Sequence, residues 1–418
     1  MEKILASVIT IGDELLIGQV VDTNSAWIAQ ELNKAGIWLK RRVSVGDVKE
    51  EIVHALKEET KGSHIIIITG GLGPTNDDIT KQVLNEYFGG KLVVNEEVLK
   101  HIKYLFEQVF RRPIIERNLQ QAEVPDVCTV LPNKRGTAPG MWFEKEGKVY
   151  VSLPGVPHEM KGLMTGEVIP RLQQVFTMPF IDHRTLLTAG IGESYLAETI
   201  KDWEAQLPAH LKLAYLPNYG MVRLRITGMG SDKTALNASL DTEFVKLQQL
   251  VREWLVTNQD ISLPMALLEL LRSKNKSMGT AESCTGGYMA HLITSIPGAS
   301  NNYKGSVVAY DNDVKKQVLG VAPGTLQKLG AVSEEVVREM VKGALAQLKT
   351  DYAVAVSGIM GPDGGTPEKP VGTVWVAAGN SGKQVTQQFH FRYDRQRNIE
   401  MTAIQALNLL RKFIVENS

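Results

Sequence analysis

The stretch that decides the fold is Ile65-Ile66-Ile67-Ile68-Thr69, followed at once by Gly70-Gly71-Leu72-Gly73-Pro74. Consecutive β-branched residues without polar alternation predict a strand that is buried on both faces. The glycine-rich turn leads into a helical segment near residues 78–88. A repeated order of strand, turn and helix indicates a parallel sheet with helices on both sides, so we expect an α/β fold.

The same order surrounds this stretch. Residues 4–11 form a short apolar run, and residues 26–34 are typical of a helix with Asn24 or Ser25 as its N-cap. Residues 149–153 predict another strand, followed by a helix near 158–175. We therefore expect residues 1–176 to form the first domain.

Two further domains are expected. Residues 177–257 combine half-buried strands (185–189, 221–227) with helices (193–206, 233–256), which indicates a small α+β domain with a connector helix. Residues 258–418 return to the α/β pattern, with expected helices at 264–274, 285–296, 333–349 and 397–415 and strands at 277–281, 305–310, 352–357, 371–378 and 384–391. Ser333 is the expected N-cap of the amphipathic helix 333–349.

Composition excludes several classes of protein. A chain of 418 residues exceeds the size of one hydrophobic core, and 43% hydrophobic with 22% charged residues is ordinary globular usage. Because 46 Lys and Arg balance 46 Asp and Glu, there is no basic surplus for general nucleic-acid or membrane binding. The two cysteines, Cys128 and Cys284, make no CxxC pair, so a disulfide framework is not expected. No run of 18 apolar residues occurs, and we read residues 4–11 as a first strand rather than a signal peptide, which predicts a cytoplasmic protein.

Several loops at predicted strand ends carry candidate chemistry in the last domain. Ser283 lies between a strand and Thr285-Gly286-Gly287, where it either acts as a nucleophile or merely caps a helix. The glycines would let backbone N–H groups approach a ligand. The domain's histidines, His291 and His390, lie in a predicted helix and strand, so the alternative base is a lysine or tyrosine. Tyr310 and Lys315 follow the next strand, and their other reading is a solvated charged loop.

Two more loops indicate a ligand crevice. Residues 357–365 are rich in glycine after a buried strand, and Asp394-Arg395 places a guanidinium after another. In the first domain, residues 70–80 would offer bare amides to a phosphate. Asp77 and Asp78, with Asp13 and Glu14 after the first strand, could hold a divalent cation or simply complement a helix dipole.

The last domain resembles a known family. Thr280-Ala281-Glu282-Ser283-Cys284-Thr285-Gly286-Gly287, Tyr310-Asp311-Asn312, Ser357-Gly358-Ile359 and Pro370-Val371-Gly372-Thr373 resemble the CinA C-terminal domain, the nicotinamide mononucleotide (NMN) deamidase also called PncC. The resemblance implies hydrolysis of NMN to nicotinate mononucleotide and ammonia without a cofactor. It implies Ser283 as nucleophile, Tyr310 and Lys315 as its activating pair, and Arg395 as a further active-site residue. It also implies substrate contacts by Thr285, Gly286, Gly287, Asn312 and Ser357. Tyr393 stands where a glycine is usual, which leaves Arg397 as the alternative to Arg395.

The first two domains resemble the same family. Gly12-Asp13-Glu14, Asp22-Thr23-Asn24, the 70–80 loop and Leu153-Pro154-Gly155-Val156-Pro157 resemble the CinA N-terminal domain, which is similar to the molybdopterin-binding fold of MoaB and MoeA. The resemblance implies a metal-dependent ADP-ribose pyrophosphatase that uses Mg, Mn or Co. The expected metal residues are Asp13, Glu14, Asp77 and Asp78, and the expected substrate residues are Asn24, Gly70, Gly71, Gly73 and Thr75. The middle domain resembles the family's KH-like insert, but Gly190-Ile191-Gly192 does not fit a GXXG loop.

The sequence therefore predicts a two-activity hydrolase of pyridine-nucleotide salvage and NAD recycling. Its expected partners are NMN and ADP-ribose, with no membrane, no nucleic acid and a homodimeric assembly. The alternative is a non-catalytic nucleotide- or pterin-binding protein linked to competence or DNA damage.

Overall fold

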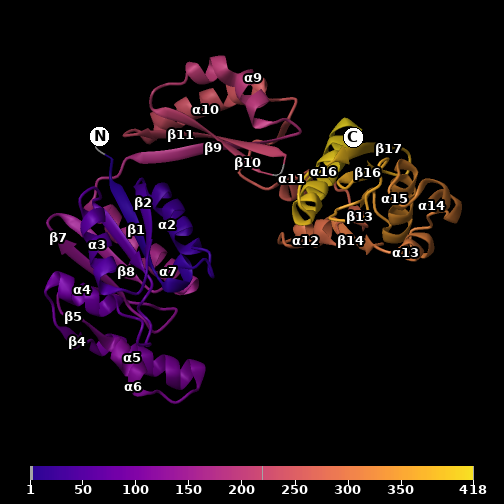
Figure 1. Ribbon diagram of the computed structural model, residues 1–418. Coiled ribbons are helices and arrows are strands. Elements are labelled where there is room, and N and C mark those ends of the chain that lie inside the picture. Colours follow the sequence, from indigo (N-terminus) through magenta and orange to yellow (C-terminus); the bar gives the residue numbers. More distant parts are fainter. Residues whose placement is uncertain (1–2, 219, 418) are drawn as a thin grey trace. The chain divides into compact units, whose positions relative to one another are not determined.

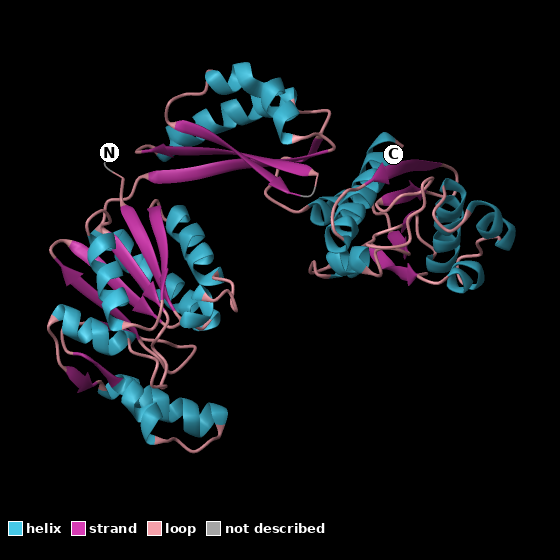
Figure 2. Cartoon of the chain, in the orientation of Figure 1, coloured by secondary structure: helices cyan, strands magenta, loops and turns pink. Residues whose placement is uncertain are grey.

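The chain divides into two compact units (Figures 1 and 2). The computed structural model describes residues 3–218 and 220–417. One unit contains the chain up to Asp182 together with Gly228–Asn237, and the other contains His183–Thr227 and the chain from Ala238 onward.

The first unit is built on a six-stranded sheet in the order β2-β1-β3-β8-β7-β6. Its strands are β1 (Leu5–Ile11), β2 (Trp38–Val45), β3 (Ile65–Thr69), β6 (Thr129–Leu131), β7 (Gly140–Lys145) and β8 (Lys148–Leu153). β2, β1, β3 and β8 pair in parallel, whereas β7 runs antiparallel to both of its neighbours, β8 and β6. A separate two-stranded sheet pairs β4 (Leu92–Val94) with β5 (Glu123–Pro125).

The strand β3 explains the layered core. Ile65 and Ile67 belong to the apolar cluster on one face of the sheet, and Ile66 and Ile68 belong to the cluster on the other. The first face packs α2 (Thr23–Lys34), α7 (Pro157–Leu163) and α8 (Ile169–Val175), and the second packs α3 (Lys49–Thr60) and α4 (Thr80–Phe88). The remaining helices are α1 (Asp13–Leu16), α5 (Glu96–Tyr104) and α6 (Glu116–Leu119), with π-helical turns at Leu105–Phe110 and Met164–Val168 and a 3₁₀ turn at Gln120–Ala122. The expected three-layer α/β fold is confirmed.

The middle of the chain forms a four-stranded sheet in the order β10-β11-β9-β12. Its strands are β9 (Phe180–Ala189), β10 (Leu211–Asn218), β11 (Met221–Gly230) and β12 (Leu255–Thr257), and α9 (Glu193–Ala205) and α10 (Lys233–Leu250) lie on one face (Figure 1). The expected helix 233–256 is too long at its end. Leu255 pairs with Thr188 across the sheet, so residues after Leu250 leave the helix to complete the β-sheet.

The C-terminal sheet has five strands in the order β14-β13-β15-β16-β17. These are β13 (Met278–Glu282), β14 (Tyr303–Val308), β15 (Tyr352–Gly358), β16 (Thr373–Gly379) and β17 (Gln384–His390), of which the first three are parallel. One face packs α11 (Leu263–Ser273), α12 (Tyr288–Thr294) and α16 (Arg395–Glu416), and the other packs α13 (Asn312–Gln317), α14 (Pro323–Leu329) and α15 (Glu334–Leu348). A 3₁₀ turn covers Ala299–Asn301.

One expected helix cap is wrong, and the other is confirmed by position only. Asp22, not Asn24 or Ser25, caps α2, because its carboxylate accepts the amide of Ser25 at 2.9 Å. Ser333 is the N-cap residue of α15 as expected, but its hydroxyl donates to the carbonyl of Gly330 at 3.0 Å and accepts no amide of the helix. Both cases show that polar side chains next to a helix start form local hydrogen bonds with backbone groups a few residues away.

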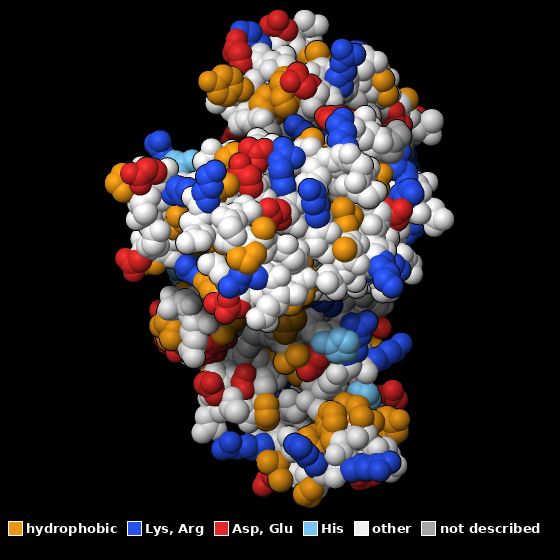
Figure 3. All heavy atoms as spheres, turned by 90° about the vertical axis from the view of Figure 1, so that its right-hand side faces the viewer, with side chains coloured by type: hydrophobic (Ala, Val, Ile, Leu, Met, Phe, Trp, Pro, Cys, Tyr) orange, Lys and Arg blue, Asp and Glu red, His pale blue; other side chains and the backbone are white. Residues whose placement is uncertain are grey.

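Surface features agree with the balanced composition. Across the described residues, no helix has the length and apolar content needed to span a membrane. On the face drawn in Figure 3, the Lys and Arg side chains are interspersed with Asp and Glu rather than gathered in one patch.

Candidate functional sites

Ser283 lies at the end of the central parallel strand of the C-terminal sheet. Its amide donates to the carbonyl of Val356 in β15 at 3.2 Å, so its backbone continues the sheet. The side chain is only 8% exposed. Within the part of the chain that the structure describes, the Ser283 hydroxyl has no hydrogen-bond partner. The serine is therefore held rigidly by its backbone while its oxygen remains available to a ligand.

The turn after Ser283 differs from the expectation. Gly286 and Gly287 have φ of 59° and 97°, a region that disfavours side chains with a Cβ. The Gly286 amide donates to the carbonyl of Ser283 at 3.1 Å, and the Gly287 amide donates to the carboxylate of Glu282 at 3.1 Å. The expectation that these two amides are free for a ligand is wrong, because the turn uses both internally. Substrate contacts by Thr285, Gly286 and Gly287 stay a prediction.

Lys315 in α13 is buried although it carries an amine. Its Nζ donates to the carbonyls of Ala309 at 2.8 Å and Tyr310 at 3.1 Å, and its side chain is 1% exposed. Burial lowers the pKa of Lys315 below the ordinary lysine value, although nearby Asp311 acts to raise it. The Ala309 amide in turn donates to the carbonyl of Glu282 at 2.7 Å. The segment that holds the Lys315 amine is therefore bonded to the last residue of β13, directly before Ser283.

Arg395 and Tyr310 meet at the same edge of the sheet. One guanidinium nitrogen of Arg395 donates to the hydroxyl of Tyr310 at 3.1 Å, and the other donates to the carbonyl of Gly361 at 2.7 Å. The guanidinium of Arg397 lies 4.6 Å from the ring centre of Tyr393. The structure thus brings Arg395, rather than Arg397, against Tyr310.

The remaining residues that were expected in this site do not all contact one another. The described hydrogen bonds do not join the Ser283 hydroxyl to the Tyr310 hydroxyl or to the Lys315 amine. Ser357 is buried and donates to the carbonyl of Ala331 at 2.8 Å, and Asn312 begins α13 directly after its cap, Asp311. Burial raises the pKa of the neighbouring thiol Cys284 to about 12, so this cysteine is a poor nucleophile.

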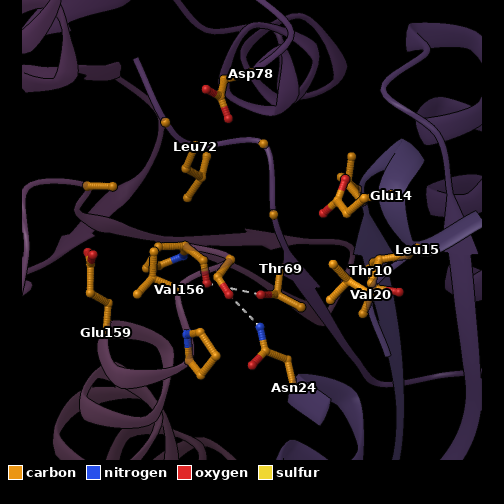
Figure 4. A pocket seen from close by; sticks show the side chains of 18 of the residues that line it. Thr10, Glu14, Leu15, Val20, Asn24, Thr69, Leu72, Asp78, Val156 and Glu159 are labelled. Atoms are coloured by element: carbon orange, nitrogen blue, oxygen red, sulfur yellow. Dashed lines mark hydrogen bonds between the residues drawn. The ribbon is translucent and has the colours of Figure 1, made fainter. Parts of the chain in front are cut away.

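A second site lies in the first unit, at the carboxyl ends of β1, β3 and β8. Loops from these strands and the start of α2 enclose a cavity of about 460 Å³ (Figure 4). Side chains labelled around it in the figure include Glu14, Asn24, Leu72, Asp78 and Glu159. Ligands of open α/β sheets bind at this edge.

The glycine loop after β3 presents backbone donors to this cavity. In the described chain, the amides of Gly71, Leu72 and Gly73 donate to no protein acceptor. A Cβ at Gly71 would lie 2.2 Å from the hydroxyl of Thr80, and φ at Gly71 is 62°, so only glycine fits. Successive unbonded amides are a suitable cradle for a phosphate.

Two buried amide oxygens at the same cavity lack hydrogen-bond partners among the residues that the structure describes. Asn24 donates through Nδ2 to the carbonyl of Gly155 at 2.7 Å, but its Oδ1 is buried without a hydrogen bond, and so is Oε1 of Gln121. Both residues line the cavity, and Gln121 is 6% exposed. A buried oxygen without a donor is costly, which fits a ligand that supplies hydroxyl or amine hydrogens here.

The expected metal residues do not form one site, although the carboxylates of Asp13, Glu14 and Asp77 all lie near enough to Asp47 to raise its pKa. Asp13 and Asp47 bind each other's amides at 3.3 and 3.2 Å, and Asp78 accepts the amide of Thr75 at 2.9 Å. Glu14 and Asp78 line the cavity, whereas Asp13 and Asp77 are not among the residues that line it. Over residues 3–218 and 220–417, no group of three or more His, Cys, Asp or Glu side chains is arranged to hold a metal ion. The residues present do not form a cation site, and we derive no step through a metal.

Three further cavity or site residues were missed from the sequence. Asp47 follows β2 as Gly46-Asp47, which repeats the Gly12-Asp13 pattern after β1, and that repetition was a usable signal. Burial raises the pKa of Asp47, and the nearby carboxylates of Asp13 and Glu14 add to this. Glu159 lines the cavity and accepts Nδ2 of Asn133 at 2.6 Å, and burial raises its pKa as well. Gln121 comes from a distant 3₁₀ turn and had no sequence signal.

Comparison with known proteins matches each part of the chain. Residues 7–174 match the family model of the probable molybdopterin binding domain, residues 183–255 that of the damage-inducible protein CinA KH domain, and residues 260–414 that of the CinA C-terminal domain. The expected boundaries at 176 and 257 lie close to the ends of these matches, but the three-part division stays a prediction.

Whole-chain relatives agree with these matches. A CinA-like protein of Cytophaga hutchinsonii is 48% identical over 99% of this chain and 99% of its own length, and one of Flavobacterium psychrophilum is 45% identical with the same coverage. A crystal structure of the competence/damage inducible protein CihA from Agrobacterium tumefaciens is 36% identical, covers 36% of this chain and 93% of its own, and has a TM-score of 0.36. The whole-chain identities and the three domain matches show that the chain belongs to the CinA family, with a molybdopterin-binding-like domain, a KH-like domain and a CinA C-terminal domain in this order.

Proposed function

We propose that the C-terminal domain is an amidohydrolase that converts NMN and water into nicotinate mononucleotide and ammonia. The observation that carries the proposal is the environment of the Lys315 amine. The amine is buried, its pKa is lowered, and it donates to the carbonyls of Ala309 and Tyr310. The Ala309 amide in turn donates to Glu282, the residue before Ser283. A lysine whose pKa is lowered by burial is suited to accept a proton from a serine hydroxyl.

The proposed reaction uses only side chains of this domain. The oxygen of Ser283 adds to the carboxamide carbon of NMN while its proton passes through the Tyr310 hydroxyl to the Lys315 amine. The C–N bond then breaks, and ammonia leaves with that proton. Water attacks the resulting ester, which gives the carboxylate of nicotinate mononucleotide and restores the serine. Arg395, which already contacts Tyr310, is suited to bind the substrate's phosphate.

The test is product analysis with the full chain. NMN is incubated with the protein, and ammonia and nicotinate mononucleotide are measured together. Formation of both in equal amounts supports the proposal. No ammonia above the buffer control would instead favour a non-catalytic binding protein.

A second activity is proposed for the first domain: hydrolysis of the pyrophosphate bond of ADP-ribose to AMP and ribose 5-phosphate. The unbonded amides of Gly71, Leu72 and Gly73 at the edge of a 460 Å³ cavity favour a phosphate-containing ligand. The rival is a pterin or nucleotide that is bound without turnover. Incubation with ADP-ribose, with and without added divalent cation and chelator, distinguishes turnover from binding and tests the expected Mg, Mn or Co dependence.

A further inference from the structure

The carboxylate of Glu282 has an unusual environment beside Ser283. Glu282 is the last residue of β13 and is completely buried. Among the described residues it forms no ion pair with any Lys, Arg or His. A buried carboxylate without a cation is costly unless its oxygens accept several hydrogen bonds.

Donors from three segments converge on this carboxylate. The turn and α12 contribute the Thr285 hydroxyl at 2.7 Å and the amides of Gly287, Met289 and Ala290 at 3.1, 3.0 and 2.8 Å. The neighbouring strand β14 contributes the hydroxyl of Ser306 at 3.2 Å, and β13 itself contributes that of Thr280 at 3.4 Å. This set of donors supplies hydrogen bonds to both carboxylate oxygens.

These contacts replace a helix cap that the sequence cannot supply. The N-cap residue of α12 is Gly287, which has no side chain to accept the first amides of the helix. Glu282 reaches across from the strand and accepts these amides in its place. Ser283 lies between Glu282 and the start of α12, and its own amide is hydrogen-bonded to Val356 in β15.

We propose that Glu282 is a positioning residue for the amidase reaction. Its carboxylate holds the turn 284–287 against β13, so that the Ser283 hydroxyl keeps one direction. It also accepts hydrogen bonds from the amides of Gly287, Met289 and Ala290. In the described chain, the amides of Cys284 and Thr285 have no protein acceptor. These two amides therefore face the carbonyl oxygen of the substrate. This inference rests on the proposed function of the C-terminal domain.

The test is the Glu282→Gln variant in the full chain, assayed for ammonia release over a range of NMN concentrations. The glutamine keeps the size of the side chain, but its NH₂ group faces donors, so the turn shifts. A misplacement of about 1 Å at a reacting group costs about 100-fold in rate, and we expect kcat to fall by that order while KM changes less than about threefold. Glu282→Asp, which keeps the charge but is shorter, should recover part of kcat.

A matched control exists in the same unit. Glu339 of α15 caps the start of α14 in a similar way, since it accepts the Ala322 amide at 2.7 Å and the Thr325 hydroxyl at 2.8 Å. Glu339→Gln loses a comparable cap away from Ser283, so its kcat should stay within about twofold of the unmodified protein.

The outcomes separate this inference from the proposed function. An unmodified protein that releases no ammonia contradicts the proposed function. An active unmodified protein with Glu282→Gln at undiminished kcat, or with a KM change that accounts for the whole loss, overturns only the positioning role. If circular dichroism shows that Glu282→Gln is unfolded, Thr285→Val removes one donor without touching the charge. That variant should then lower kcat about tenfold at unchanged KM, and unchanged kcat would overturn the proposal.

Discussion

The glycine-rich turns after β3 and after β13 look alike in sequence, but their backbone amides have different hydrogen-bond partners. After β3, the amides of Gly71, Leu72 and Gly73 have no acceptor within the described chain and border a 460 Å³ cavity. After β13, the amides of Gly286 and Gly287 are bound by Ser283 and Glu282. The first turn is suited to bind an anion through its backbone, whereas the second is suited to hold a reactive side chain in place. The glycine amides of such a turn are therefore available to a ligand only where no nearby carbonyl or carboxylate accepts them.

The largest effect is expected at the C-terminal site, where side chains carry the chemistry. Lys315→Met should lower kcat for NMN deamidation by about 1,000-fold, because the methionine fills the same space without a proton acceptor. The rate of ammonia release measures this. Retention of more than a tenth of the rate would show that the lysine is not the base.

The pH dependence of the unmodified protein gives an independent check on the same residue. Only the neutral amine can accept the serine proton, and burial lowers the pKa of Lys315, so the rate should rise with pH through that lowered pKa and level off below the ordinary lysine value of about 10.4. A rate that is still rising with pH above that value would contradict the assignment.

A smaller effect is expected from the arginine that meets Tyr310. Arg395→Ala should reduce kcat/KM about 50-fold through the loss of one charge-assisted contact to the substrate phosphate and of the bond to the Tyr310 hydroxyl. The matched variant Arg397→Ala, whose side chain lies over Tyr393, should change kcat/KM less than about threefold. Equal losses in both variants would mean that neither arginine has the specific role.

The backbone site should respond to an added Cβ rather than to a lost side chain. In Gly71→Ala, the new methyl group would lie 2.2 Å from the Thr80 hydroxyl at a φ of 62°, so the loop must move. A strain of about 1–2 kcal/mol predicts ADP-ribose binding that is weaker by about tenfold, with deamidation unchanged. Isothermal titration and the ammonia assay measure the two effects. Unaltered ADP-ribose affinity would place the phosphate elsewhere.

The smallest effect is expected at Gln121, whose buried Oε1 has no hydrogen-bond partner in the described part of the chain. Gln121→Leu should leave thermal stability unchanged or slightly higher, because no bond is lost and a polar burial cost is removed. It should also weaken ADP-ribose binding about fivefold, since one acceptor for the ligand disappears. A clear fall in melting temperature would show that this oxygen has a structural partner.

Much of the fold could be predicted from local sequence. The isoleucine run of β3 and the alternation of strands and helices on both sides determine the layered architecture. One error occurs where a tertiary contact decides, since β12 forms because it completes a sheet with β9. The other is local, since the Asp22 carboxylate accepts the Ser25 amide three residues on and so begins α2 earlier than expected.

The sites were less predictable, because they depend on which groups satisfy one another. Sequence motifs indicated Ser283, Lys315 and Arg395, and the structure adds the burial of Lys315 and the contact of Arg395 with Tyr310. No local pattern could show that Glu282 accepts the amides of α12. Likewise, no local pattern could show that the carboxylates of Asp13 and Asp47, which follow two different strands, accept each other's backbone amides.

The central claim is that the hydroxyl of Ser283, and not the adjacent thiol, is the nucleophile. The most direct measurement is ammonia release from NMN by Ser283→Ala and Cys284→Ala, each compared with the unmodified protein. The account predicts background activity for Ser283→Ala and a rate within a fewfold of the unmodified protein for Cys284→Ala, because burial keeps that thiol protonated with a pKa of about 12. An inactive Cys284→Ala variant together with an active Ser283→Ala variant would contradict it.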